Sequence, residues 1–130
     1  MKKFFLLLSA AFSFTATSLR AQQEPIRWTA SYKSSGAGEG EIVIVAAIEK
    51  SWHIYSQNAT ADGPVPTSFT FPQGKNYELQ GKPTEIGAHE LFDKTFDARI
   101  SSFSDKAEFR QKIKYTGKPG FSIPFKVEFM

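Results

Sequence analysis

Apolar and polar residues alternate with a period of two along several stretches of this chain. The first stretch is residues 26–32, and similar stretches occur at residues 95–103, 108–115 and 121–130. Because successive side chains of a β-strand point to opposite faces, this period predicts half-buried strands. Pro124 cannot donate to a ladder, so its end of the last stretch is predicted to be an edge or a bulge.

Other apolar runs are shorter or less regular, but they also favour strands. Residues 41–49 (EIVIVAAIE) form a short, β-branched run bounded by charges, which predicts a central strand covered on both faces. Residues 52–55 (WHIY) follow after two residues and can continue that strand past a bulge. Residues 67–71, 77–79 and 82–86 are further candidate strands.

Turns and loops separate these candidates. The clearest is the loop that ends in Gly63-Pro64-Val65-Pro66, where each proline fixes φ and favours extended geometry in the residue before it. No stretch combines a helical period with caps. Seven to nine short strands in about 109 residues predict an all-β fold, a single immunoglobulin-like β-sandwich domain over residues 22–130.

The first 21 residues have the pattern of a secretory signal peptide. Lys2 and Lys3 precede the apolar run FFLLLSAAFSF, and cleavage is predicted before Gln22. The run is shorter than the roughly 20 residues that span a bilayer. We therefore expect a periplasmic or secreted protein whose mature chain has no membrane span.

Removing this segment changes the charge balance. The chain has 16 Lys and Arg against 13 Asp and Glu, and three of the basic residues, Lys2, Lys3 and Arg20, lie in the segment. The remaining chain is formally neutral. It has no basic surplus of the kind that favours nucleic acid, so no nucleic-acid partner is predicted.

Few residues suggest catalysis. The chain has no cysteine, which excludes thiol chemistry by its own residues. His53 and His89 are isolated and lie in no metal-ligand spacing, so neither a metal nor a cofactor is predicted. Glu85, Glu90 and Asp93 could pair as acid and base, although loop carboxylates more commonly serve solvation. No nucleophile motif is present, and no catalytic residue is assigned.

The aromatic residues allow two interpretations. Trp52, Tyr55, Phe69, Phe71 and Phe92 can all be explained as core. Residues 87–94, however, show no clean period and place Leu91 and Phe92 among charged neighbours. This stretch is predicted to be a loop whose apolar residues are exposed or cap a site.

One family resemblance accompanies these patterns. The chain has Trp-His-Ile-Tyr-Ser at residues 52–56, then Gly-Pro-Val-Pro-Thr-Ser-Phe-Thr-Phe at 63–71 and His-Glu-Leu-Phe-Asp-Lys-Thr-Phe at 89–96. These motifs occur in this order between the apolar run at 41–49 and a closing alternating strand. Together they resemble the N-terminal domain of DsbD-type thiol:disulfide interchange proteins, the disulfide-bond corrector domains. The resemblance covers most of the mature chain.

The resemblance implies a fold, a partner and a site. The family's domain is an immunoglobulin-like sandwich outside the cytoplasmic membrane that receives electrons from a thioredoxin-like domain and passes them to oxidised proteins. A loop with apolar or aromatic residues caps the reactive disulfide, and Trp52 and Tyr55 would lie near that cap. The residues in the position of the cap are His89, Glu90, Leu91, Phe92, Asp93 and Lys94.

The chain departs from the family at the reactive position. The family has two cysteines followed by Pro-Pro just after a strand like residues 126–130, whereas this sequence ends at Met130 without a cysteine. Two explanations are open: a shortened form of a redox protein, which the end on an apolar alternation favours, or a cysteine-free relative kept as a binding module.

Two functions are therefore expected. The first is a thiol-disulfide relay domain that docks thioredoxin-like partners but is inert as written. The alternative is a non-catalytic immunoglobulin-like module that binds a protein or a glycan at the same end of the sandwich.

Overall fold

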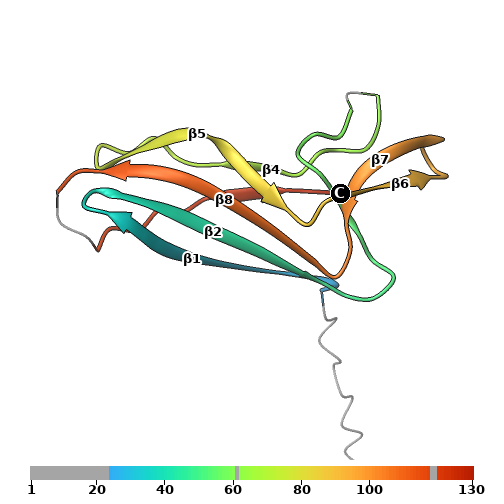
Figure 1. Cartoon of the computed structure of the whole chain (residues 1–130), viewed down its shortest axis with the longest axis horizontal. Helices are drawn as coiled ribbons and strands as arrows, with labels where there is room; N and C mark the ends of the chain where they lie inside the picture. The colour runs from blue at the N-terminus through green and yellow to red at the C-terminus, as the bar shows by residue number, and fades with distance from the viewer. Residues whose placement is uncertain (1–23, 61, 118–119) are drawn as a thin grey trace, which may run out of the picture.

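The computed structural model describes residues 24–60, 62–117 and 120–130. The predicted signal peptide, residues 1–21, lies outside the described residues. The described residues form antiparallel strands packed as an all-β, immunoglobulin-like sandwich (Figure 1), which confirms the predicted fold class. The strands are β1 (Ile26–Gly36), β2 (Glu39–Ile48), β3 (Ile54–Tyr55), β4 (Ser68–Thr70), β5 (Tyr77–Ile86), β6 (His89–Asp93), β7 (Ala98–Phe103), β8 (Lys106–Tyr115) and β9 (Lys126–Glu128).

The strands form three sheets. The largest has the order β1-β2-β8-β5, the second has β3-β7-β6, and β4 pairs with β9. β1 and β2 are joined by a tight turn in which Gly38 has a φ of 70°, a conformation that glycine adopts without strain. The four-stranded sheet forms one layer, and β4 with the C-terminal segment lies across it (Figure 1).

The core lies between these layers. Its fully buried side chains include Ile44 from β2 and Phe109 from β8, and partly buried Phe69 and Phe125 pack against them from the opposite layer. The rings of Phe69 and Phe109 meet edge to face at a centroid distance of 4.9 Å. Aromatic contacts of this kind add to the free energy gained from burial. The other core residues are Ile26, Ile42, Ala46, Ile48, Ile54, Phe103, Ala107 and Ile113.

β2 is an inner strand, as predicted, but it is not covered equally on both faces. Its buried residues alternate with half-buried ones, and Ile42, Ile44, Ala46 and Ile48 face the core. The continuous run of apolar residues therefore does not mark a strand buried on both sides, because the outer face of this antiparallel sheet has no covering layer among the described residues.

β5 is one irregular strand where two separate strands were predicted. The register shifts between Gln80 and Thr84, and Gly81 adopts a φ of 72°. This bulge accommodates Gly81 and Pro83 at a sheet edge, where a missing N–H donor is tolerated. The fully buried Gln111 of β8 donates from Nε2 to the carbonyl oxygen of Gly81 at 3.1 Å.

The segment from Trp52 to Tyr55 does not continue β2, contrary to the prediction. The chain turns at residues 49–52, where the Trp52 N–H donates to the Glu49 carbonyl at 3.1 Å and Ser51 has a φ of 72°. β3 then pairs with β7 in the second sheet. The positive φ of Ser51 ends the strand, whereas a bulge would only interrupt its pairing.

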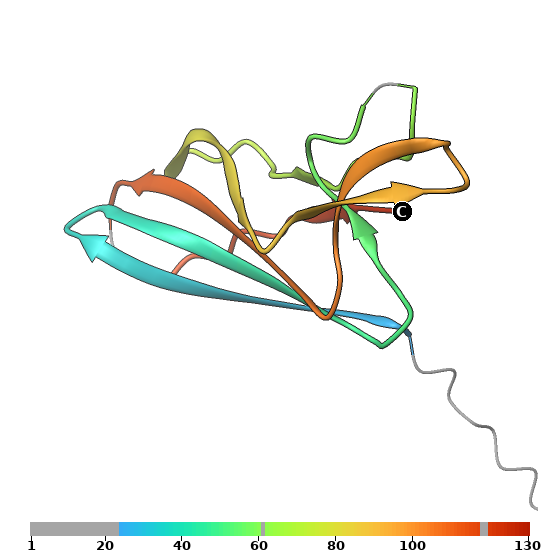
Figure 2. The ribbon, with the colours of Figure 1, turned by 45° about the vertical axis from the view of Figure 1, so that its right-hand side comes forward.

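β6 and β7 form a hairpin that projects beyond the end of the four-stranded sheet (Figures 1 and 2). The stretch around residues 89–93 was predicted to be a loop, and it is a strand. β7 begins at Ala98 and not at residue 95, because residues 94–97 make the turn and Asp97 has a φ of 50°.

The C-terminal stretch forms less strand than its period predicts. Only Lys126–Glu128 pairs, with β4, and Pro124 precedes it. The side chains of residues 121–128 still alternate between the core and the solvent, and Ile123 and Phe125 pack on the core. The alternation of apolar and polar side chains therefore persists where the chain packs on the core without backbone pairing in a sheet.

Candidate functional site

A pocket of about 380 Å³ lies at the base of the hairpin. Residues from three segments line it: the turn after β2 with β3, the strand β6 with its turn, and the strand β7 with the turn after it. The lining residues are Ser51, Trp52, His53, Tyr55, Leu91, Phe92, Asp93, Lys94, Thr95, Ile100, Ser102, Ser104 and Asp105. The structure thus brings Trp52 and Tyr55 together with Leu91, Phe92, Asp93 and Lys94, six of the eight site residues predicted from the sequence.

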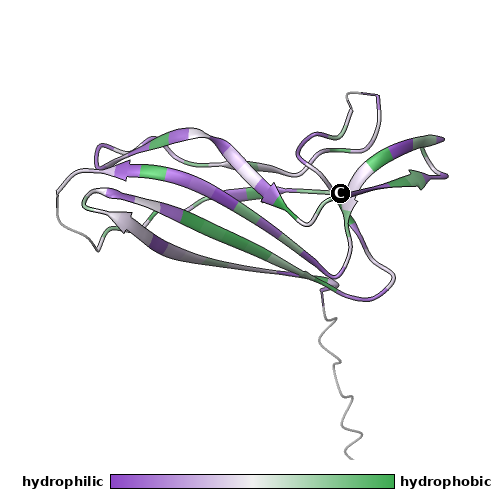
Figure 3. Cartoon of the chain, in the orientation of Figure 1, coloured by the Kyte–Doolittle hydropathy of each residue, from purple (hydrophilic) through white to green (hydrophobic). Residues whose placement is uncertain are grey.

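Three large apolar side chains around this pocket are unusually exposed. Trp52 is 55%, Leu91 52% and Phe92 56% accessible. Leu91 and Phe92 are consecutive residues of β6, so they point to opposite faces of the hairpin. Figure 3 shows hydrophobic residues in both hairpin strands, beyond the end of the main sheet. The site is therefore an apolar projection beside a pocket.

The opposite wall of the pocket is tied to the hairpin by a tyrosine. The buried Tyr55 donates its hydroxyl proton to Asp93 Oδ2 at 2.6 Å, across 38 residues of sequence. Asp93 Oδ1 also accepts the Thr95 N–H at 2.8 Å, which closes the first part of the hairpin turn. One carboxylate therefore joins β3, the end of β6 and the turn after it.

His53 extends this network to the solvent side. Its Nε2 lies 3.1 Å from the Tyr55 hydroxyl and 4.0 Å from Asp93 Oδ2. Since the single hydroxyl proton of Tyr55 is directed to Asp93, the Tyr55 oxygen must accept, and His53 Nε2 is the donor. The histidine is therefore protonated at Nε2, either as that neutral tautomer or as the cation.

The network shifts two pKa values in opposite directions. Burial, and then the hydrogen bond to Asp93, raises the pKa of Tyr55 to about 12. The hydrogen bond from Tyr55 lowers the pKa of Asp93, and backbone N–H groups from Thr95 and Phe96 act in the same direction, while partial burial opposes them. At neutral pH the pair is a neutral phenol and a carboxylate, which is an arrangement that binds and orients rather than one that transfers protons.

The remaining two predicted residues lie outside the pocket lining. His89 and Glu90 are at the start of β6, opposite Ser102 and Ser101 of β7. Glu90 forms an exposed ion pair with Arg99, with 3.8 Å between the carboxylate oxygen and Nε. The six residues assigned to a cap loop are therefore five residues of a strand, followed by Lys94 in the turn.

Sequence patterns missed several residues of the site. Asp93 was placed in the cap, but its hydrogen bond to Tyr55 had no sequence signal, since the two residues are far apart in the chain. His53 was interpreted as a strand side chain. A usable signal was the turn itself: Asp93 and Asp97 bracket Lys-Thr-Phe, and aspartates at such positions are typical of turns. The residues missed altogether are Ser51, Thr95, Ile100, Ser102, Ser104 and Asp105.

The three carboxylates that were considered as acid and base have separate partners. Asp93 accepts from Tyr55, and Glu90 pairs with Arg99. Glu85 accepts from the Ser56 hydroxyl, from the Gln57 N–H at 3.1 Å and from the Asn58 side chain at 3.3 Å. Glu85 therefore holds the loop after β3 against β5, which is a structural function.

Within residues 24–60, 62–117 and 120–130, no group of three or more His, Cys, Asp or Glu side chains is arranged to hold a metal ion. The same residues contain no helix long and apolar enough to cross a membrane.

Fold and site together define the class: an immunoglobulin-like sandwich with an aromatic pocket at the base of a protruding hairpin. Comparison of the chain with protein-family models, with curated proteins and with solved structures found no match.

Proposed function

We propose that this chain is an exported docking domain that binds thioredoxin-like proteins of a thiol-disulfide relay through the hairpin and the pocket at its base. The chain has no cysteine, so none of its own bonds is made or broken. Electrons pass between thiols of the partners, and this domain contributes binding alone.

The observation that carries the proposal is the exposure of Leu91 and Phe92 on opposite faces of β6. A side chain on one face could be covered by a movement of the hairpin onto the body. Two side chains on opposite faces cannot both be covered in this way, and a partner that grips the hairpin would cover both. Aromatic and aliphatic anchors of this kind supply most of the affinity of protein interfaces.

Rigid positioning of the hairpin supports the same function. The hydrogen bond from Tyr55 to Asp93 fixes the end of β6 relative to β3, and the Asp93–Thr95 bond fixes the turn. A preorganised binding element loses less conformational entropy on association, which raises affinity. The choice of a thioredoxin-like partner rests on the resemblance of residues 52–56, 63–71 and 89–96 to the DsbD N-terminal domains.

Binding of the full chain to purified extracytoplasmic thioredoxin-like domains, measured by surface plasmon resonance, tests the proposal. We expect Leu91→Ala and Phe92→Ala each to weaken binding by about five- to thirtyfold, because anchor residues typically contribute 1–2 kcal/mol or more. Ile86→Ala is the matched control, since Ile86 is 49% exposed on β5, away from the pocket lining. Equal affinities for all three variants and the unchanged chain would contradict the proposal.

A glycan is the second candidate ligand. The half-exposed Trp52 ring lies beside the polar side chains of Ser51 and His53 in the same pocket, and sugars stack on such rings while hydroxyl groups bind the polar neighbours. Titration with oligosaccharides separates the two functions. Saturable binding that is lost in Trp52→Ala and retained in Leu91→Ala would favour the glycan.

A further inference from the structure

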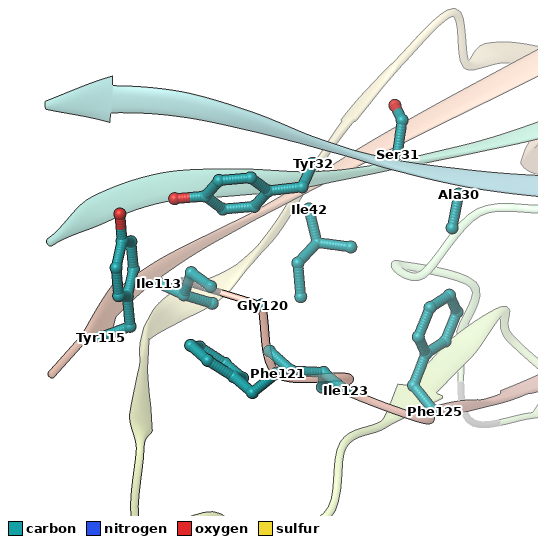
Figure 4. Close-up of a pocket in the computed structure, with 10 residues that line it drawn as sticks. All are labelled: Ala30, Ser31, Tyr32, Ile42, Ile113, Tyr115, Gly120, Phe121, Ile123 and Phe125. Carbon is teal, nitrogen blue, oxygen red and sulfur yellow. The ribbon is translucent and has the colours of Figure 1, made fainter. Parts of the chain in front are cut away.

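A second pocket, of about 300 Å³, lies at the other end of the sandwich, between the four-stranded sheet and the segment before β9 (Figure 4). Its floor is formed by the buried side chains of Ile42 and Ile113. Phe121, Ile123 and Phe125 line it from the opposite layer. The hairpin contributes none of the lining residues, so this pocket is separate from the docking site.

The pocket exists because a small residue occupies a core-facing position. Trp28, Ala30 and Tyr32 share one face of β1, and Ala30 is exposed although it points towards the opposite layer. Ala30 lies between the larger side chains of Trp28 and Tyr32 on this face, and its methyl group leaves the space between them unfilled.

Gly40 allows Tyr32 to take its position at the mouth of the pocket. A Cβ atom at Gly40 of β2 would overlap the Tyr32 ring, so the ring lies directly over the glycine. In this position the Tyr32 hydroxyl donates to the Glu39 carbonyl oxygen at 3.3 Å. The ring of Tyr115 meets it edge to face at a centroid distance of 6.2 Å.

The two tyrosines give the mouth a defined polarity. Their rings are in edge-to-face contact, and Figure 4 shows the hydroxyl groups at the same end of the pocket. Each hydroxyl has one proton. The proton of Tyr32 is committed to the Glu39 carbonyl oxygen. The Tyr32 oxygen retains lone pairs, so it can accept a hydrogen bond at this end of the pocket.

We propose that the pocket binds a neutral aromatic compound of one or two rings that carries one N–H or O–H donor, such as indole or a phenol. None of the described lining residues is charged, which favours an uncharged ligand. A dry apolar cavity of about 150 Å³ holds benzene, so twice that volume accommodates two fused rings. The donor of the ligand meets the Tyr32 oxygen, and its rings fill the space over Ala30.

The test is a titration of the full chain, labelled at isoleucine methyl groups, with indole and with 1-methylindole, followed by NMR. We expect indole to shift the Ile113 and Ile123 methyl signals saturably below about 1 mM, an affinity that a fragment of this size can reach. We expect 1-methylindole to bind about three- to tenfold more weakly, because it lacks the donor. No saturable shift with indole would overturn the proposal.

Three variants locate the ligand. Ala30→Phe fills the pocket and should abolish binding, while Thr29→Phe places the same ring on the other face of β1 and should not change it. Tyr32→Phe should weaken indole binding about three- to tenfold and remove the preference for indole over 1-methylindole. A preference that survives this change would overturn the donor assignment. Shifts that depend on protein concentration and not on indole would assign the pocket to self-association and overturn ligand binding.

Discussion

The body of the sandwich and the β6–β7 hairpin use apolar residues in opposite ways. In β2, Ile42, Ile44, Ala46 and Ile48 are almost wholly buried, and most of the intervening residues are half-buried. In β6 the four residues from His89 to Phe92 are all exposed, and only Asp93 is partly buried. Burial of apolar area is what stabilises a fold. The apolar residues of the body therefore maintain the structure, whereas those of the hairpin remain available to another molecule.

Truncation of one phenylalanine in each region gives the largest expected contrast. Phe109 is 0% exposed and contacts the rings of Trp28, Phe69 and Phe103. We expect Phe109→Ala to lower the free energy of unfolding by about 3–5 kcal/mol, measured by urea denaturation. Phe92→Ala should stay within about 0.5 kcal/mol of the unchanged protein. A comparable loss in both variants would remove the distinction between the regions.

A buried amide in the body has the next largest expected effect. Gln111 is 1% exposed, and its Nε2 donates to the carbonyl oxygens of Gly81 and Lys112. Gln111→Leu leaves these carbonyls without that donor and should cost about 1–3 kcal/mol in the same measurement. Lys112→Leu, at the exposed neighbouring position, is the control. If the two leucine variants unfold at the same urea concentration, the bulge in β5 does not depend on Gln111.

The hydrogen bond from Tyr55 to Asp93, which joins the body and the hairpin, should be lost at both low and high pH. The pKa of Asp93 is lowered in the fold, so its contribution is present above the ordinary carboxyl value of about 3.9 and is lost as pH falls through the folded value. The pKa of Tyr55 is raised to about 12, so its contribution is full below the ordinary value of about 10 and is lost as pH rises towards 12.

Carbon-13 NMR titration of the Asp93 carboxyl group measures this coupling. In Tyr55→Phe the pKa of Asp93 should move upward, because the largest cause of its depression is removed. An unchanged value would show that the backbone N–H groups hold the carboxylate without help from Tyr55.

The smallest expected effect is on the outer surface of the hairpin. Glu90 and Arg99 are both about two-thirds exposed, and their charged atoms are 3.8 Å apart. Exposed pairs contribute little, so Glu90→Gln should change the free energy of unfolding by less than about 0.5 kcal/mol. A larger loss would mean that this part of the hairpin carries more of the stability than its exposure indicates.

Sequence patterns predicted the body well because its signals are local. The alternation through Phe109, Gln111 and Ile113 is a property of one strand, and it survives in the fold even where a glutamine takes a core position. Where the sequence prediction failed, a single residue changed the path of the chain. Ser51 and Asp97 have positive φ values, which residue propensities do not predict. Ser51 lies in the turn after β2, and Asp97 lies in the turn between β6 and β7.

The candidate site was only partly predictable for a different reason. Leu91 and Phe92 stood out because they interrupt a charged stretch, and Trp52 and Tyr55 stood out as aromatics. The hydrogen bond between Tyr55 and Asp93 depends on the pairing of β3 and β6 with β7, which no local pattern specifies. The pocket over Ala30 likewise depends on the distance between two layers.

The brevity of β3 has a consequence for how this molecule can be altered. A ladder of two residue pairs and the Tyr55–Asp93 bond join β3 to the hairpin sheet, and in the turn at residues 94–97 the Phe96 ring meets the Tyr55 ring edge to face at a centroid distance of 6.1 Å. Insertions at that turn would therefore disturb the contacts of Tyr55 as well as lengthen the hairpin. The turn is a support for β3, and replacing its sequence would alter how the hairpin and the body are held together.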